Sequence, residues 1–130
     1  LVGSIADIYG KTGDAQYLPF FEDKLETVGL YSMFDFYGKY YSMLSTQDVP
    51  AMQKAAEKLG SIAGNLSTNM YRKFVSMNTL NRIKGAMTEK QNEMPNDTNI
   101  STALAKIKTI MDDIKSRETN KMLVDRYKGF

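Results

Sequence analysis

The sequence of 130 residues predicts an all-α protein, organised as an α-solenoid of about three stacked antiparallel helix pairs. Two observations predict this fold class. Apolar residues recur at spacings of three and four along the chain, and no stretch sustains the alternation that is typical of strands. A short segment also repeats, because DIYGK at residues 7–11 recurs as DFYGK at residues 35–39 and more weakly as RIKG at residues 82–85. Such an internal repeat favours stacked helix pairs within a single domain over residues 1–130.

The first helix pair is predicted in residues 1–28. A short helix is expected to end at Gly10. Asp14 follows as the expected N-cap of a second helix, since its carboxylate can accept hydrogen bonds from the free N–H groups of a first turn. Pro19 is tolerated because it lies near the start of that helix. The apolar stripe of the second helix is Leu18, Phe21, Leu25 and Val28.

The second pair is predicted in residues 30–64, after a break at Gly29. Asp48 is the expected cap of its second helix, with Pro50 in the first turn. Gly64 is expected to end that helix. The stripe predicted to be buried in the first helix of the pair is Leu30, Phe34, Tyr37, Tyr41 and Leu44. The stripe of the second helix is Met52, Ala56, Leu59 and Ile62 or Ala63.

The third pair is predicted in residues 67–127. Ser67 is the expected cap of a helix whose stripe is Met70, Phe74, Met77, Leu80 and Ile83. Residues 92–99 include Pro95 and have no apolar period, so they predict a loop. The next helix is expected from about Ser101, with the stripe Leu104, Ile107, Met111 and Ile114. The stripe lapses over residues 117–121 and resumes with Met122, Leu123 and Tyr127.

One alternative concerns the middle of the chain. The apolar stripe runs from Met52 to Met87 and is compatible with one long helix of a coiled coil. Gly60, Gly64 and Gly85 argue against an unbroken rod, since each internal glycine costs about 1 kcal/mol relative to alanine. The sequence therefore favours two helices with a turn near Gly64.

The composition excludes several functions for this chain. It contains no cysteine and no histidine, so it offers no disulfide, no thiolate nucleophile and no imidazole for acid–base catalysis or metal binding. No catalytic, cofactor-binding or metal-ligating residue is therefore assigned. No apolar run approaches the roughly 20 residues of a membrane-spanning helix. The chain starts with Leu1 and shows no signal peptide, which leads us to expect a piece of a longer protein.

Charge is distributed unevenly along the chain. Residues 1–48 carry three lysines against seven acidic residues and hold ten of the fourteen aromatic residues. Residues 49–130 carry fourteen basic residues against eight acidic ones. A basic half can indicate nucleic-acid binding. Here acidic residues lie between the basic ones along each helix, which is typical of solvated helix faces, and no nucleic-acid partner is expected.

The start of the chain resembles a HEAT repeat. The residues that carry this resemblance are IADIYGKTGD at 5–14, YLPFF at 17–21 and Leu25. The order of the whole chain resembles the C-terminal helical domain of bacterial aminopeptidase N-like zinc metallopeptidases. The aromatic second pair, the helix that contains Arg72, and LVDRY at 123–127 agree with that resemblance.

The resemblance implies a HEAT/armadillo-like fold and a non-catalytic accessory role. The parent chain would carry an H-E-x-x-H helix, a distal glutamate and one zinc ion upstream of this domain. This domain would pack on that catalytic domain, wall one side of the substrate cavity and meet peptide substrate only through the parent. The alternative function is a stand-alone α-solenoid that serves as a protein–protein interaction scaffold.

Two features have both a functional and a structural interpretation. The resemblance implies that Arg72 could face the substrate cavity and bind a peptide carboxylate with its planar guanidinium. The structural interpretation is an ion-pair partner within the helical array. The aromatic cluster of residues 31–41 is expected either to fill the core of the second pair or to form a patch that docks on a preceding domain.

Overall fold

A computed structural model describes residues 15–130, and within them every regular element is a helix. The elements are η1 (Ala15–Tyr17), α2 (Leu18–Lys24), α3 (Leu30–Leu44), α4 (Val49–Ala63), α5 (Met70–Glu93), α6 (Thr98–Arg117) and α7 (Lys121–Tyr127). The predicted all-α class is thereby confirmed. The expected first helix, the Asp14 cap and the first copy of the repeat lie outside the described residues.

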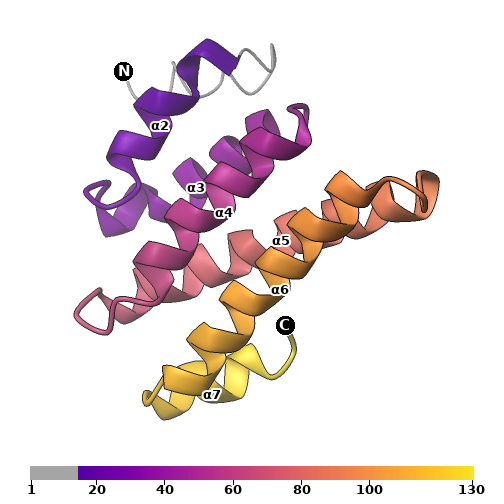
Figure 1. Cartoon of the computed structure of the whole chain (residues 1–130). Helices are drawn as coiled ribbons and strands as arrows, with labels where there is room; N and C mark the ends of the chain where they lie inside the picture. The colour runs from indigo at the N-terminus through magenta and orange to yellow at the C-terminus, as the bar shows by residue number, and fades with distance from the viewer. Residues whose placement is uncertain (1–14) are drawn as a thin grey trace.

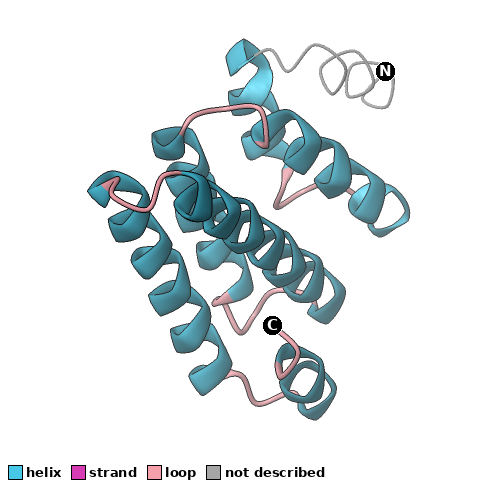
Figure 2. Ribbon diagram, turned by 90° about the vertical axis from the view of Figure 1, so that its right-hand side faces the viewer, coloured by secondary structure: helices cyan, strands magenta, loops and turns pink. Residues whose placement is uncertain are grey.

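The helices form two layers (Figure 1). α2, α4 and α6 lie toward the viewer and run in one direction, and α3 and α5 lie behind them and run in the opposite direction. Short loops join consecutive helices, so that the direction alternates from α2 to α6 (Figure 2). α5 is the central helix, because it packs against α3, α4, α6 and the short α7.

The boundary between α4 and α5 follows the sequence prediction. α4 ends at Ala63, α5 begins at Met70, and the single long helix is therefore wrong. The start of α4 is also as expected, because Asp48 caps it by accepting a 3.0 Å hydrogen bond from the backbone N–H of Ala51. Gly64 follows the last residue of α4 as its C-cap.

The N-caps of α5 and α6 differ from those predicted. Asn69, rather than Ser67, caps α5 and accepts a 2.8 Å hydrogen bond from the N–H group two residues further on. α6 begins before the expected Ser101, because Oδ1 of Asp97 accepts bonds of 2.9 and 3.3 Å from two first-turn N–H groups. In both cases several polar residues precede the apolar stripe, and only the local backbone conformation decides which of them becomes the cap.

The buried face of α3 also differs from the prediction. Leu30 and Phe34 are half exposed, at 50% and 52%, and Tyr41 is partly buried. The side chains that α3 buries are Met33, Phe36, Tyr37, Tyr40, Met43 and Leu44. α3 carries apolar residues around more than half of its circumference, so its periodicity alone fits either face. The packing of α2 decides between them, since the ring of Phe21 stacks on Phe36 at 4.8 Å between centroids.

Two glycines allow α4 and α6 to approach closely. A Cβ atom on Gly60 would lie 2.5 Å from Cγ2 of Ile110, and one on Gly64 would lie 2.8 Å from a guanidinium nitrogen of Arg117. Real Cβ contacts are longer than this, so a side chain at Gly60 would push the helices apart or displace Ile110. Gly85 in α5 has open space around it and provides a comparison.

We predict opposite effects for alanine at these two helical glycines. Gly85→Ala should raise the free energy of unfolding by about 0.5–1 kcal/mol, because it restricts the unfolded chain without a clash. Gly60→Ala restricts the unfolded chain in the same way, but the added methyl group overpacks against Ile110 at a cost of about 1–3 kcal/mol. The free energy of unfolding should therefore fall. Urea denaturation measures both values. Equal stabilisation by the two alanines would contradict the close α4–α6 contact.

Candidate functional site

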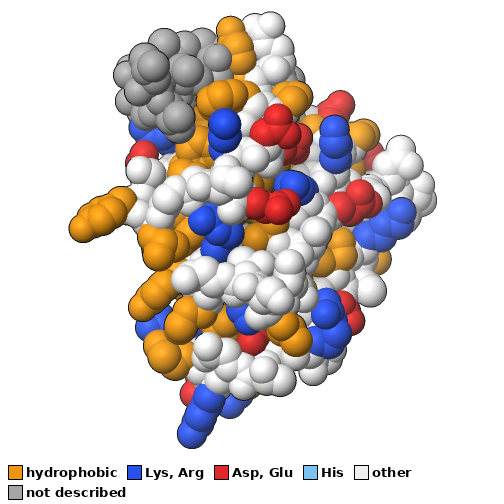
Figure 3. Space-filling view, turned by 90° about the vertical axis from the view of Figure 1, so that its left-hand side faces the viewer, with side chains coloured by type: hydrophobic (Ala, Val, Ile, Leu, Met, Phe, Trp, Pro, Cys, Tyr) orange, Lys and Arg blue, Asp and Glu red, His pale blue; other side chains and the backbone are white. Residues whose placement is uncertain are grey.

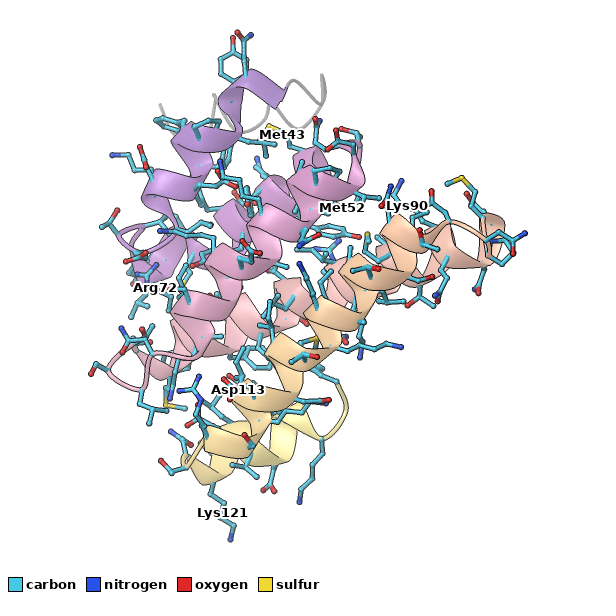
Figure 4. All side chains as sticks on the ribbon, viewed as in Figure 1. Met43, Met52, Arg72, Lys90, Asp113 and Lys121 are labelled. Carbon is cyan, nitrogen blue, oxygen red and sulfur yellow. The ribbon has the colours of Figure 1, made fainter. Side chains whose placement is uncertain are left out.

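Arg72 lies in the first turn of α5 and binds the connection between α2 and α3. Its Nη1 donates to the carbonyl oxygen of Leu25 and its Nη2 to that of Val28, each at 2.6 Å. The last carbonyls of a helix have no partner within the helix, so a cation here also suits the helix dipole. Figure 4 shows Arg72 beside this end of α2. The guanidinium thus links α2 to α5.

A polar pocket of about 210 Å³ adjoins Arg72. Its other lining residues come from the α2–α3 connection, the end of α4 and the following loop: Glu26, Ser61, Ile62, Asn65, Thr68 and Asn69. The pocket carboxylate is already paired, because Nζ of Lys58 lies 2.6 Å from Glu26. The lining offers hydrogen bonds to a small polar group. The predicted contact between Arg72 and a substrate carboxylate stays a prediction.

The next residue, Lys73, points elsewhere and forms a buried ion pair with Glu118. Nζ lies 2.8 Å from Oε1 and donates to Oε2 at 3.0 Å, and the side chains are 5% and 1% exposed. Oε2 also accepts the backbone N–H groups of Thr119 and Asn120. Burial raises the pKa of Glu118, but the bonds from Lys73 and the two N–H groups, with the charge of Lys73, hold that pKa below its usual value.

The structure divides the aromatic cluster of residues 31–41. Phe36, Tyr37 and Tyr40 are buried, and the two phenols find acceptors: Tyr37 donates to the carbonyl of Leu25 at 2.6 Å and Tyr40 to the carboxylate of Glu22 at 3.0 Å. Burial is the main cause that raises the pKa of both phenols, so they stay neutral donors. These three residues follow the core interpretation of the cluster.

Two other members of the cluster, Tyr31 and Phe34, contribute to an exposed surface, which we call the apolar face. It consists of Leu30, Tyr31, Phe34, Tyr71 and Met122, from α3, α5 and α7, which are between 50% and 107% exposed. Figure 3 shows hydrophobic side chains gathered along the left-hand edge of the molecule. Large apolar side chains grouped on one surface are typical of interaction sites.

A groove of about 210 Å³ lies within the apolar face. Its apolar lining is Phe34, Met70, Tyr71, Phe74, Met122 and Leu123. Arg126 is the one charged residue in the lining, and its guanidinium carbon lies 5.6 Å from the ring centroid of Phe74. Among residues 15–130 no carboxylate forms an ion pair with Arg126, since the neighbouring Asp125 pairs with Lys128. The groove is therefore apolar with one available cation at its edge.

The sequence did not predict this groove. Its apolar stripes placed Leu30, Phe34 and Met122 among the buried residues, whereas the structure exposes all three, and Tyr71 was assigned to no surface. One feature of the sequence does indicate such a surface, which is the presence of two apolar stripes on α3. A helix with more than one apolar face needs a second contact besides the core.

The described residues offer neither a metal site nor a membrane-spanning helix. Within residues 15–130, no three acidic side chains come close enough together to hold a metal ion. In the same part of the chain, no helix combines the length and apolar character needed to cross a membrane.

Comparison with models of known protein families, with curated protein sequences and with solved structures found no match.

We predict that Arg72→Ala lowers stability. It removes two charge-assisted hydrogen bonds to carbonyls that are partly accessible to water, so the free energy of unfolding should fall by about 1–3 kcal/mol. Arg72→Lys should give an intermediate value, because an ammonium lacks the planar fork that reaches both oxygens. Urea denaturation of the isolated chain tests this. Unchanged stability, together with a raised KM in the full-length protein, would instead support substrate contact.

We predict that Glu118→Gln costs about 3–5 kcal/mol, because it leaves Lys73 buried without a counter-charge. The double variant Lys73→Met/Glu118→Gln should recover most of that loss. Folding lowers the pKa of Glu118 from its ordinary value of 4.5. The ion pair therefore contributes its full stabilisation above pH 4.5, and this contribution is lost as the pH falls through the lower pKa of the folded state. Denaturation of the wild type and Glu118→Gln between pH 7 and acidic pH should therefore show converging stabilities. A single-variant loss below about 1 kcal/mol would refute the role of the pair.

Proposed function

We propose that this chain is the non-catalytic C-terminal accessory domain of a zinc-dependent aminopeptidase-like peptidase. It packs on the catalytic domain of the same chain and walls one side of the substrate cavity. The observation that carries the proposal is the apolar face, which extends over α3, α5 and α7 although the core beneath it is filled. A helical domain that presents such a face beside a complete core fits an element that docks on a neighbouring domain.

The arrangement of the helices supports the HEAT/armadillo-like part of the proposal. In such arrays, helix pairs stack so that equivalent helices lie side by side in two layers. α3 and α5 pack together, as do α4 and α6, and this is the neighbour relation that a stack of pairs requires. The extensive packing of α4 against α5 then joins the second pair to the third.

The zinc ion that the resemblance implies has no fitting ligands among the described residues. The sequence contains no histidine or cysteine, and the acidic side chains of residues 15–130 do not cluster. The proposal therefore assigns zinc and peptide-bond chemistry to the upstream part of the parent chain. The role of this chain is to supply shape and to exclude substrates that do not fit the cavity.

Docking through the apolar face would contribute a useful amount of energy. A large apolar side chain contributes about 1.5–3 kcal/mol when it passes from full exposure to full burial. Four members of the face are already about half buried, so each has roughly half of that left to gain, and Tyr31 has the whole of it. The summed burial free energy of the five side chains is large enough to suit a permanent contact between domains of one chain.

The proposal predicts that the full-length native protein contains about one zinc ion per chain and hydrolyses aminoacyl-p-nitroanilides. Met122→Asp, which places a charge in the docked face, should lower kcat/KM about tenfold or more, because it separates the cavity wall from the catalytic domain. Met94→Asp is the matched control, since Met94 is 48% exposed in the α5–α6 loop at the other end of the molecule, and it should keep wild-type kinetics.

Elemental analysis and steady-state kinetics provide the two readouts. A full-length protein without zinc and without peptidase activity would contradict the proposal and leave the interaction scaffold as the function. Equal kinetics for Met122→Asp and the wild type would show that the apolar face does not contact the catalytic domain.

A further inference from the structure

We propose that the groove between α3, α5 and α7 binds an acidic amphipathic segment of the domain on which the chain docks. A large apolar side chain of that segment fills the groove, and a carboxylate next to it pairs with Arg126. The inference rests on the proposed function, because it requires a domain on which this chain docks. It adds the chemical character of the segment that the groove contacts.

The size of the groove sets the size of the apolar group. Its volume of about 210 Å³ is larger than the cavity of about 150 Å³ that accepts a benzene molecule in a protein core. One leucine or aromatic side chain therefore fits. Phe34, Tyr71 and Met122 provide walls from three different helices, so an inserted side chain would contact all of them.

The electrostatics of the groove favour a negative group beside that side chain. Arg126 lies over the ring of Phe74 and has no carboxylate partner among the described residues, so it is free to accept one. α3 and α5 both begin at this surface, and neither has an acidic residue in its first turn. Gly29 gives α3 no side-chain cap, so the partial positive charge at its N-terminus is uncompensated.

The acidic residues near the groove do not offset this preference. Asp35 on α3 lies 3.8 Å from Lys39, and Asp125 on α7 lies 3.3 Å from Lys128, so each acid has its own cation. α7 carries two basic residues, Lys121 and Arg126, whereas lipid surfaces are bound through clusters of about four or more. A protein segment with one acid beside an apolar anchor is the occupant that both the shape and the charge favour.

Photo-crosslinking in the full-length native protein tests the inference directly. p-Benzoylphenylalanine replaces Tyr71, which is 54% exposed and lines the groove, and in the control protein it replaces Met94. Mass spectrometry then identifies the crosslinked peptide. We expect the probe at position 71 to attach to one segment that has Asp or Glu within about one helical turn of the attachment point. The probe at position 94 should not attach to it.

Charge exchange completes the test. Arg126→Glu should lower the crosslink yield about tenfold, because it places two like charges together, and a Lys in place of the identified acid should restore it. Attachment only to lipid or to a second copy, a segment without an acid, a yield at position 71 no higher than at position 94, or a yield that Arg126→Glu leaves unchanged would each overturn the inference. Attachment to a separate protein with reciprocal charge rescue would support the groove chemistry and contradict the accessory-domain function.

Discussion

The first turn of α5 holds together the connections at one end of the molecule. Arg72 donates to the carbonyls that follow α2, and Lys73 pairs with Glu118 in the connection between α6 and α7. Consecutive helical residues point about 100° apart, so two neighbouring cations reach two different loops. Bonds with a charged donor are roughly twice as strong as neutral ones, which suits them to fixing loops that lack regular structure. The positions of α3 and α7 relative to α5 depend on this turn.

The groove is a consequence of those positions. Its walls come from the start of α3, the start of α5 and the short α7, which are the segments next to the fixed loops. A helix of seven residues such as α7 is too short to be stable alone, so its orientation depends on Leu123 and Tyr127 in the core and on the Glu118 turn before it. The apolar face thus lies over buried side chains and ion-paired connections. Such support lowers the entropy that the surface loses when a partner binds.

The sequence predicted the helices well because their periodicity, the Asp48 cap and the break at Gly64 are local properties. It predicted the buried face of α3 poorly, because two apolar stripes on one helix satisfy the same period and the choice depends on α2. Arg72 was recognised as notable from the resemblance, but its bonds to carbonyls join residues 47 and 44 positions apart. Contacts of that kind follow from the packing of helices and not from spacing along the chain, and the groove depends on them as well.

The apolar groove tolerates a basic residue in its lining because of the chemistry of the guanidinium group. A guanidinium is weakly hydrated and stacks on aromatic rings, so Arg126, which lies over Phe74, suits the lining of an apolar groove. An apolar side chain that enters the groove would further desolvate this cation, which raises the cost of leaving it unpaired. The groove therefore discriminates by a penalty as well as by attraction: a partner with an apolar anchor but no acid would bury an unpaired charge, and a partner with both would satisfy it.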